Sequence, residues 1–248
     1  MEGAMMTDSE NIEFGKGIKL AIFDVAGTTV MDNGLVIEAF VDAFQKIEGD
    51  ESLERGIDIA ERTMGERKID VFRQIFQDEE KAQTAHSFFI QSYLIRVKRG
   101  EVVGLPGSEL LFRELRDRGI RVALNTGFNR EILDHIISAL DWSSLIDDSI
   151  ASSEVEHGRP APDMIVELMR RCNQERSSED AIGPDEIVVC GDTVADMHAA
   201  LNAGVYRTVG VLSGIHSKEQ LIEAGAEYVV QEIGDITTLE MWNSSTTR

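Results

Sequence analysis

The sequence predicts an α/β protein with a doubly wound, Rossmann-like parallel sheet as its core and an α-helical cap inserted after the first strand. Two patterns indicate this class. After about residue 105, short apolar runs alternate with segments of helical periodicity, which is typical of parallel sheets covered on both faces. Before that point, about 75 residues carry apolar side chains only at helical spacing, which indicates a helical insertion.

The first strand is expected over residues 18–23, where apolar residues run consecutively and Asp24 follows. In the next segment, Val36, Phe40 and Phe44 recur four residues apart, as on one face of a helix. The cap is therefore expected over residues 33–103.

Hinge-like stretches at 32–34 and 104–107 would join this cap to the core. The core would then comprise residues 18–32 and 104–248. Residues 1–17 are acidic and polar, without the apolar segment of a secretory signal, and are expected to form a disordered or frayed tail.

The later elements follow from similar signals. A helical pattern over 108–118 ends at Gly119, a typical residue just after a helix, and a strand is expected over 120–124. Another helix begins near Pro162, which is favourable in a first helical turn. The remaining predicted elements are helices over 129–140 and 195–202 and strands over 187–190 and 206–212.

Composition excludes several classes of partner. Lys plus Arg number 24 and Asp plus Glu number 45, so the net charge of −21 disfavours nucleic acid and anionic membranes. The longest run without a formal charge, residues 82–95, is too short for a membrane span. The only two cysteines, Cys172 and Cys190, provide no disulfide framework, which favours a cytoplasmic location.

Polar motifs lie where the predicted strands end. The carboxyl ends of parallel strands form one edge of the sheet, and reactive groups gather in the crevice there. Four motifs fall at such positions: residues 24–29 (DVAGTT), 125–127 (NTG), 158–162 (GRPAP) and 191–196 (GDTVAD).

These residue types suit phosphoryl chemistry on a small anionic phosphonate or phosphate. Asp24 is the expected nucleophile, which would attack phosphorus and form an aspartyl-phosphate. Asp192 and Asp196 can hold Mg²⁺ beside it, a hard cation that prefers oxygen ligands and offsets the repulsion between two anions. The Thr126 hydroxyl and the Arg159 guanidinium can bind the non-bridging phosphate oxygens.

With these four motifs in this order, residues 18–212 resemble the haloacid dehalogenase superfamily of aspartate-nucleophile hydrolases. The resemblance implies Mg²⁺ as the cofactor and a mobile cap over a Rossmann-like core. It also implies the positions of the metal site, which are Asp24, Ala26, Asp192 and Asp196.

The residue at position 26 indicates a particular group within this superfamily. Most phosphatases of this superfamily carry a general-acid aspartate two positions after the nucleophile, but the methyl group of Ala26 has no proton to donate. The motif is instead similar to that of phosphonatases (phosphonoacetaldehyde hydrolases), which cleave a carbon–phosphorus bond after a cap lysine forms a Schiff base with the substrate.

The cap segment 64–70 (MGERKID) resembles the segment that bears this lysine, and the resemblance places Lys68 at the Schiff-base position. Such a lysine must be neutral when it attacks, and burial or the charges of Arg67 and Arg73 could lower its pKa. Phosphonatases also pair through their caps, which implies a homodimer. The substrate-binding residues expected from the motifs and the resemblance are Thr126, Gly127, Arg159, Lys68, Met64 and Gly65.

Two positions depart from the phosphonatase pattern, because Val71 and Phe128 stand where phosphonatases have a histidine and a tyrosine. A first alternative is a phosphomonoesterase acting on a small metabolite such as phosphoglycolate, with Glu66 or Asp70 as proton donor. Others are a metal-independent carbon–halogen hydrolase and a non-catalytic binding or regulatory protein. The histidines show no metal-ligand spacing and are interpreted as structural: His86, His135, His157, His198 and His216.

Overall fold

The computed structural model describes residues 17–49, 53–174, 176–178 and 180–239. The tail expected over residues 1–17 lies outside this part of the chain except for Gly17, which is exposed.

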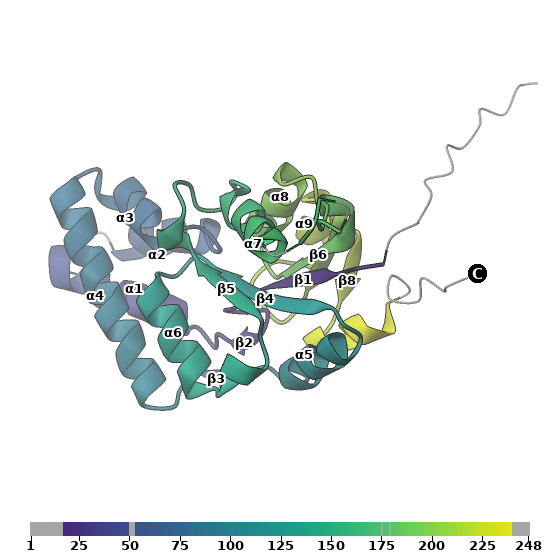
Figure 1. Ribbon diagram of the computed structural model, residues 1–248. Coiled ribbons are helices and arrows are strands. Elements are labelled where there is room, and N and C mark those ends of the chain that lie inside the picture. The colour runs from purple at the N-terminus through teal and green to yellow at the C-terminus, as the bar shows by residue number, and fades with distance from the viewer. Residues whose placement is uncertain (1–16, 50–52, 175, 179, 240–248) are drawn as a thin grey trace, which may run out of the picture.

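A six-stranded sheet with the order β5-β4-β1-β6-β7-β8 forms the core, and all its neighbouring strands are parallel (Figure 1). The first strand, β1, lies between β4 and β6, and the register pairs Asp24 with Asn125 at the carboxyl ends of β1 and β4. The polar residues after these strands therefore share one edge, as the sequence predicts. The strands are β1 (Leu20–Asp24), β4 (Arg121–Thr126), β5 (Asp148–Ala151), β6 (Ile187–Gly191), β7 (Arg207–Val211) and β8 (Tyr228–Val230).

Helices cover both faces of the sheet, which confirms the doubly wound class. Along β1, Leu20 and Ile22 face one layer while Ala21 and Phe23 face the other, because successive strand side chains point to opposite faces. The Leu20 face packs against α7 (Asp163–Asn173) and α8 (Val194–Asn202), and the Phe23 face against α5 (Ser108–Asp117) and α6 (Arg130–Ala139). The short helix α9 (Lys218–Glu223) packs beside α8 and β7.

In the described part of the chain, four helices are inserted between β2 (Val30–Met31) and β3 (Val103–Gly104), two short strands that pair antiparallel. The two chain crossings into and out of the insertion thus lie side by side. Figure 1 shows the helices gathered as a bundle at one end of the sheet. They are α1 (Leu35–Glu48), α2 (Leu53–Arg62), α3 (Lys68–Phe76) and α4 (Glu79–Lys98).

Aromatic rings hold the inserted helices together and connect them to the core. Phe40 packs against Phe72 and Phe89, with ring centroids 4.7 and 4.9 Å apart. Tyr93 of α4 continues this cluster and contacts Phe128, which follows β4, with a centroid separation of 4.6 Å. The apolar core therefore runs from the sheet into the bundle without interruption.

Several short strands could not be predicted from the sequence pattern. The strands β2, β3, β5 and β8 have no more than four residues each, too few for a run of alternating or consecutive apolar side chains to stand out. Both cysteines are buried and unpaired, as expected. Within the described residues, every helix is too short or too polar to cross a bilayer.

Candidate active site

Three buried aspartates meet at the carboxyl edge of the sheet. Asp24 is the last residue of β1, Asp192 follows β6, and Asp196 lies in the first turn of α8. One carboxylate oxygen from each lies within 4.8 Å of the others, and none of the three residues is more than 5% exposed. This is the arrangement that the sequence predicts for a shared cation.

Electrostatics make this cluster unfavourable without a cation. Burial raises the pKa of Asp24 to about 7, and the neighbouring Arg159 only partly opposes that rise. Burial, with repulsion from Asp24 and Asp196, raises the pKa of Asp192 well above its ordinary value. Asp196 Oδ1 makes no hydrogen bond in the described part of the chain and faces Arg159 Nη1 at 3.0 Å. Three oxygen donors in this state fit a hard divalent cation such as Mg²⁺.

Arg159 lies among these carboxylates rather than on the surface. Its Nη1 is 2.6 Å from Asp24 Oδ1, and its Nη2 donates to the side-chain and main-chain oxygens of Asn125 at 2.6 and 3.0 Å. The residue is 3% exposed. Asn125 therefore orients the guanidinium so that one of its edges faces the carboxylate of Asp24.

Thr126 is the last residue of β4, and Gly127 begins the turn that follows it. Thr126 is buried, and its Oγ1 accepts a hydrogen bond from Phe128 N. A Cβ at position 127 would lie 2.5 Å from Glu66 O and 2.9 Å from Gly65 O, so only glycine lets the segment before α3 approach the sheet this closely.

Lys68 enters the same site from the inserted helices. It is the first residue of α3 and is 4% exposed, and its Nζ lies 5.9 Å from the ring centroids of Phe40 and Phe128. Burial lowers the pKa of Lys68 to about 8, although the carboxylates of Asp24 and Asp32 oppose the change.

The cation that contributes to this lowered pKa is Arg159. Arg73, one of the arginines expected to supply this positive charge, is instead 43% exposed at its side chain and pairs with Asp70 and Glu79. Burial is thus the main cause, and it is a property of the folded chain that the local sequence does not display.

A small cavity brings most of the predicted residues together. Its volume is about 20 Å³. Ala26 contributes to its wall and can offer a metal only main-chain atoms. Asp192 and Asp196 do not line the cavity, but one carboxylate oxygen of each lies within 4.8 Å of an oxygen of Asp24, which does line it. The lining residues are Asp24, Ala26, Val36, Met64, Gly65, Lys68, Thr126, Gly127, Phe128, Arg159 and Thr193.

Other residues of the site are not assigned by the sequence analysis. Thr28 Oγ1 donates to Asp192 Oδ1 at 2.9 Å, and Thr193 Oγ1 donates to Asp196 Oδ2 at 2.5 Å. Ile215 N donates to Asp192 Oδ2 at 3.3 Å from the loop after β7. Thr28 and Thr193 stand within the quoted motifs, and the loop follows a predicted strand, so the rule that sites form at strand ends could have indicated all three.

Fold and site together define a doubly wound α/β protein with a buried carboxylate cluster at the carboxyl edge of its parallel sheet. The chain belongs to the haloacid dehalogenase-like hydrolase family, whose model matches residues 18–204. This assignment favours an enzyme over the non-catalytic alternative.

Particular relatives bear a more specific name. A phosphonoacetaldehyde hydrolase of Bacteroides fragilis is 26% identical over 90% of this chain and 96% of its own. Another, from Bacillus cereus, is 29% identical over 79% of this chain and 76% of its own. The crystal structure of a phosphonoacetaldehyde hydrolase-like protein from Oleispira antarctica superposes with a TM-score of 0.78 at 20% identity, covering 98% of this chain and 99% of that one. The resemblance to phosphonatases is thereby confirmed.

Proposed function

We propose that this protein is a Mg²⁺-dependent hydrolase that cleaves the carbon–phosphorus bond of a small phosphonate aldehyde, with phosphonoacetaldehyde as the first candidate. One observation carries the proposal: Lys68 and Asp24, which are 4% and 5% exposed, line the same cavity. Ala26, which stands where most phosphatases of the superfamily have their general acid, agrees with it. The names of the relatives support the same chemistry.

Lys68 activates the substrate in this proposal. Its neutral amine attacks the aldehyde carbon, the carbonyl oxygen departs as water with the two amine hydrogens, and a proton taken up from solvent leaves the imine protonated. A pKa of about 8 leaves about a tenth of Lys68 neutral at pH 7, far more than an ordinary lysine would provide. Burial is the main cause of this low pKa, and the rings of Phe40 and Phe128, 5.9 Å from Nζ, are part of the surroundings that exclude water from the amine.

Asp24 then attacks phosphorus. The electron pair of the carbon–phosphorus bond passes to the imine, which becomes an enamine, while phosphorus forms a bond to the Asp24 carboxylate. Arg159 and Thr126 bind the phosphoryl oxygens and stabilise their charge. Water hydrolyses the aspartyl-phosphate to release phosphate, and protonation of the enamine followed by imine hydrolysis releases the aldehyde and regenerates Lys68.

Asp24, Asp192 and Asp196 would hold Mg²⁺, with the main chain of Ala26 at the same edge. When bound, the ion supplies positive charge that offsets the repulsion between the carboxylate and the phosphonate.

The cap moves during turnover in this proposal. A cavity of about 20 Å³ has room for about one water molecule, so a substrate cannot enter it as it stands. We take residues 33–103 as the moving cap and residues 18–32 and 104–248 as the core. The paired strands β2 and β3 are where the two crossings would bend together.

Imine trapping tests the proposed function. Borohydride added with phosphonoacetaldehyde should reduce the imine and attach the substrate carbons to Lys68, as read by peptide mass spectrometry. Lys81, which is exposed on α4, is the control and should stay unmodified. Full activity in Lys68→Ala would contradict the imine mechanism.

A phosphomonoester phosphatase is the second candidate, because Glu66, next in sequence to the cavity residue Gly65, carries a carboxyl that could donate a proton. Burial raises the pKa of this half-buried carboxyl, and its main chain contacts Gly127. Asp70 is less suited, since Arg73 binds its Oδ1 at 2.8 Å. Turnover of phosphate esters such as phosphoglycolate, with loss in Glu66→Gln, would favour this candidate.

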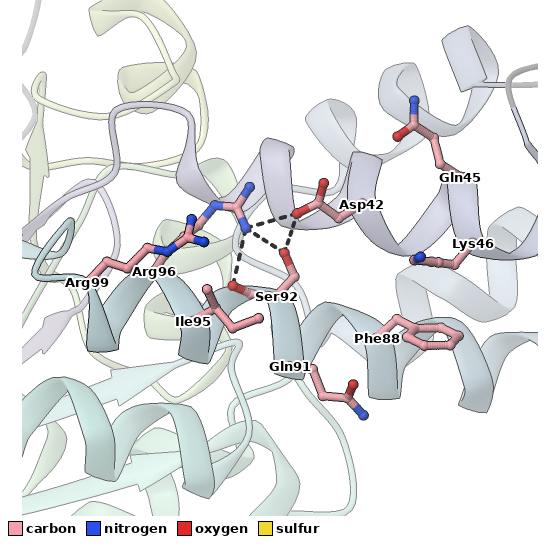
Figure 2. A pocket seen from close by; sticks show the side chains of 9 residues that line it. All are labelled: Asp42, Gln45, Lys46, Phe88, Gln91, Ser92, Ile95, Arg96 and Arg99. Atoms are coloured by element: carbon pink, nitrogen blue, oxygen red, sulfur yellow. Dashed lines mark hydrogen bonds and ion pairs between the residues drawn. The ribbon is translucent and has the colours of Figure 1, made fainter.

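We also propose that two copies pair through the cap. A groove of about 710 Å³ lies between α1 and α4, and Ile95 in its lining is 47% exposed. Figure 2 shows the side chains that line it, among them Ile95 and Phe88. Charges of both signs line it, including Asp42 and Lys46, which suits a self-complementary two-fold interface. Sedimentation should show a dimer that Ile95→Glu converts to monomer, and a monomeric wild type would exclude the pairing.

A cytoplasmic location is consistent with the unpaired cysteines.

A further inference from the structure

Arg67 joins the cap to the core immediately before Lys68. Its Nη2 donates to Val155 O at 2.6 Å, across the boundary between the inserted helices and the loop that follows β5. The side chain is only 15% exposed, and its Nε faces Asp70 Oδ2 at 3.6 Å. A hydrogen bond from a charged donor in so sheltered a place is stronger than one between neutral groups.

The same residue contacts the loop that carries Arg159. A Cβ at Gly158 would lie 2.6 Å from Arg67 Cβ and 3.4 Å from Arg67 N. Neither atom can rotate away, so this glycine permits the close approach. On the other side, Lys68 N donates to Gly127 O at 3.4 Å. The cap thus touches both phosphate-binding motifs through Arg67, which caps the N-terminus of α3, and Lys68, its first residue.

We propose that Arg67 is a positioning residue that fastens the cap to the 155–159 loop and thereby holds the Lys68 amine over Asp24. The proposal rests on the proposed function, in which Lys68 acts on the substrate, but it concerns the closed arrangement itself. Without the bond to Val155 O, the cap opens more readily and Lys68 spends more time in water.

The experiment measures how fast an amine reagent, acetic anhydride, modifies each lysine of the full-length protein, followed by peptide mass spectrometry. Lys19 in the core and Lys81 in the cap are internal references, with side chains 42% and 49% exposed. Arg67→Met removes the hydrogen bond and should speed modification of Lys68 about tenfold, the factor expected for loss of one such bond. Arg67→Lys, which keeps a charged donor, should restore part of the protection.

Two further variants distinguish an effect on closure of the cap from an effect on folding of the protein. In Gly158→Ala the new Cβ clashes with Arg67 from the core side, and Gly158 does not have the positive φ that would itself strain an alanine. This variant should expose Lys68 in the same way, even if Arg67→Met fails to fold. Arg62→Met, which removes an exposed pair with Asp58 in the same bundle, is the matched control and should leave Lys68 protected.

Kinetics complete the test. In Arg67→Met and Gly158→Ala, imine trapping should slow and kcat/KM should fall about tenfold. Unchanged modification of Lys68 in both variants would overturn the proposal, as would a lowered Tm without any change in Lys68 protection. If the wild type forms no imine with phosphonoacetaldehyde, the proposed function fails, while the modification rates still decide the role of Arg67.

Discussion

Replacing Lys68 by methionine should stabilise the protein at neutral pH. The side chain is 4% exposed, and burial lowers its pKa from near 10.5 to about 8. The difference corresponds to about 3 kcal/mol of unfavourable free energy for the charged form, at about 1.4 kcal/mol per pKa unit. Methionine has a similar length and carries no charge, so Lys68→Met should recover most of this free energy.

The stability difference between Lys68→Met and wild type should depend on pH, in a direction that follows from the pKa of Lys68. The folded chain binds the Lys68 proton less tightly than the unfolded chain, so the destabilisation is complete below pH 8 and disappears as the pH rises toward 10.5. The advantage of Lys68→Met over wild type should therefore be greatest at pH 7 and shrink above pH 8.

Urea denaturation at several pH values between 6 and 10 measures this difference. Lys81→Met is the control, because Lys81 forms an exposed pair with Glu48 and should show no comparable gain. A Lys68→Met protein that is less stable than wild type at pH 7, or a difference that does not vary with pH, would refute the reasoning.

The other predictions concern the carboxylate cluster. Asp24→Asn should reduce turnover by more than about 10³-fold while leaving the fold intact by circular dichroism, and near-normal turnover would remove Asp24 as the nucleophile. Thr28→Val deletes the hydrogen bond to Asp192 and should weaken Mg²⁺ binding about 10- to 100-fold in calorimetric titration. Thr208→Val, which removes a buried hydroxyl that donates to Gly225 O away from the cluster, should leave Mg²⁺ affinity unchanged. Treatment with EDTA should abolish turnover and Mg²⁺ should restore it, whereas resistance to EDTA would favour carbon–halogen hydrolysis.

Long elements with strong periodicity could be predicted from the sequence. The strand before Asp24 and the helices from residue 108 onward agree with β1, α5, α6, α7 and α8 to within a few residues. The meeting of Asp24, Asp192 and Asp196 was also predictable, because strand ends in a parallel sheet share one edge.

Properties that depend on packing could not be predicted in the same way. Lys68 occupies the first position of a helix, where a lysine is ordinarily solvated, and its burial depends on Phe40 and Phe128 from two other segments. The contact of Arg67 with Val155 spans 88 positions in the chain and has no local signature. The short strands β5 and β8 pair because neighbouring strands offer free edges, which is a tertiary effect.

The central claim is that Asp24 bonds covalently to phosphorus. Rapid acid quenching of a single turnover with ³³P-labelled phosphonoacetaldehyde, followed by peptide mapping, tests it directly. Transient label on the peptide that contains Asp24, absent from Asp24→Asn, is the expected result. Phosphate released in the same turnover without label ever reaching that peptide would contradict the claim.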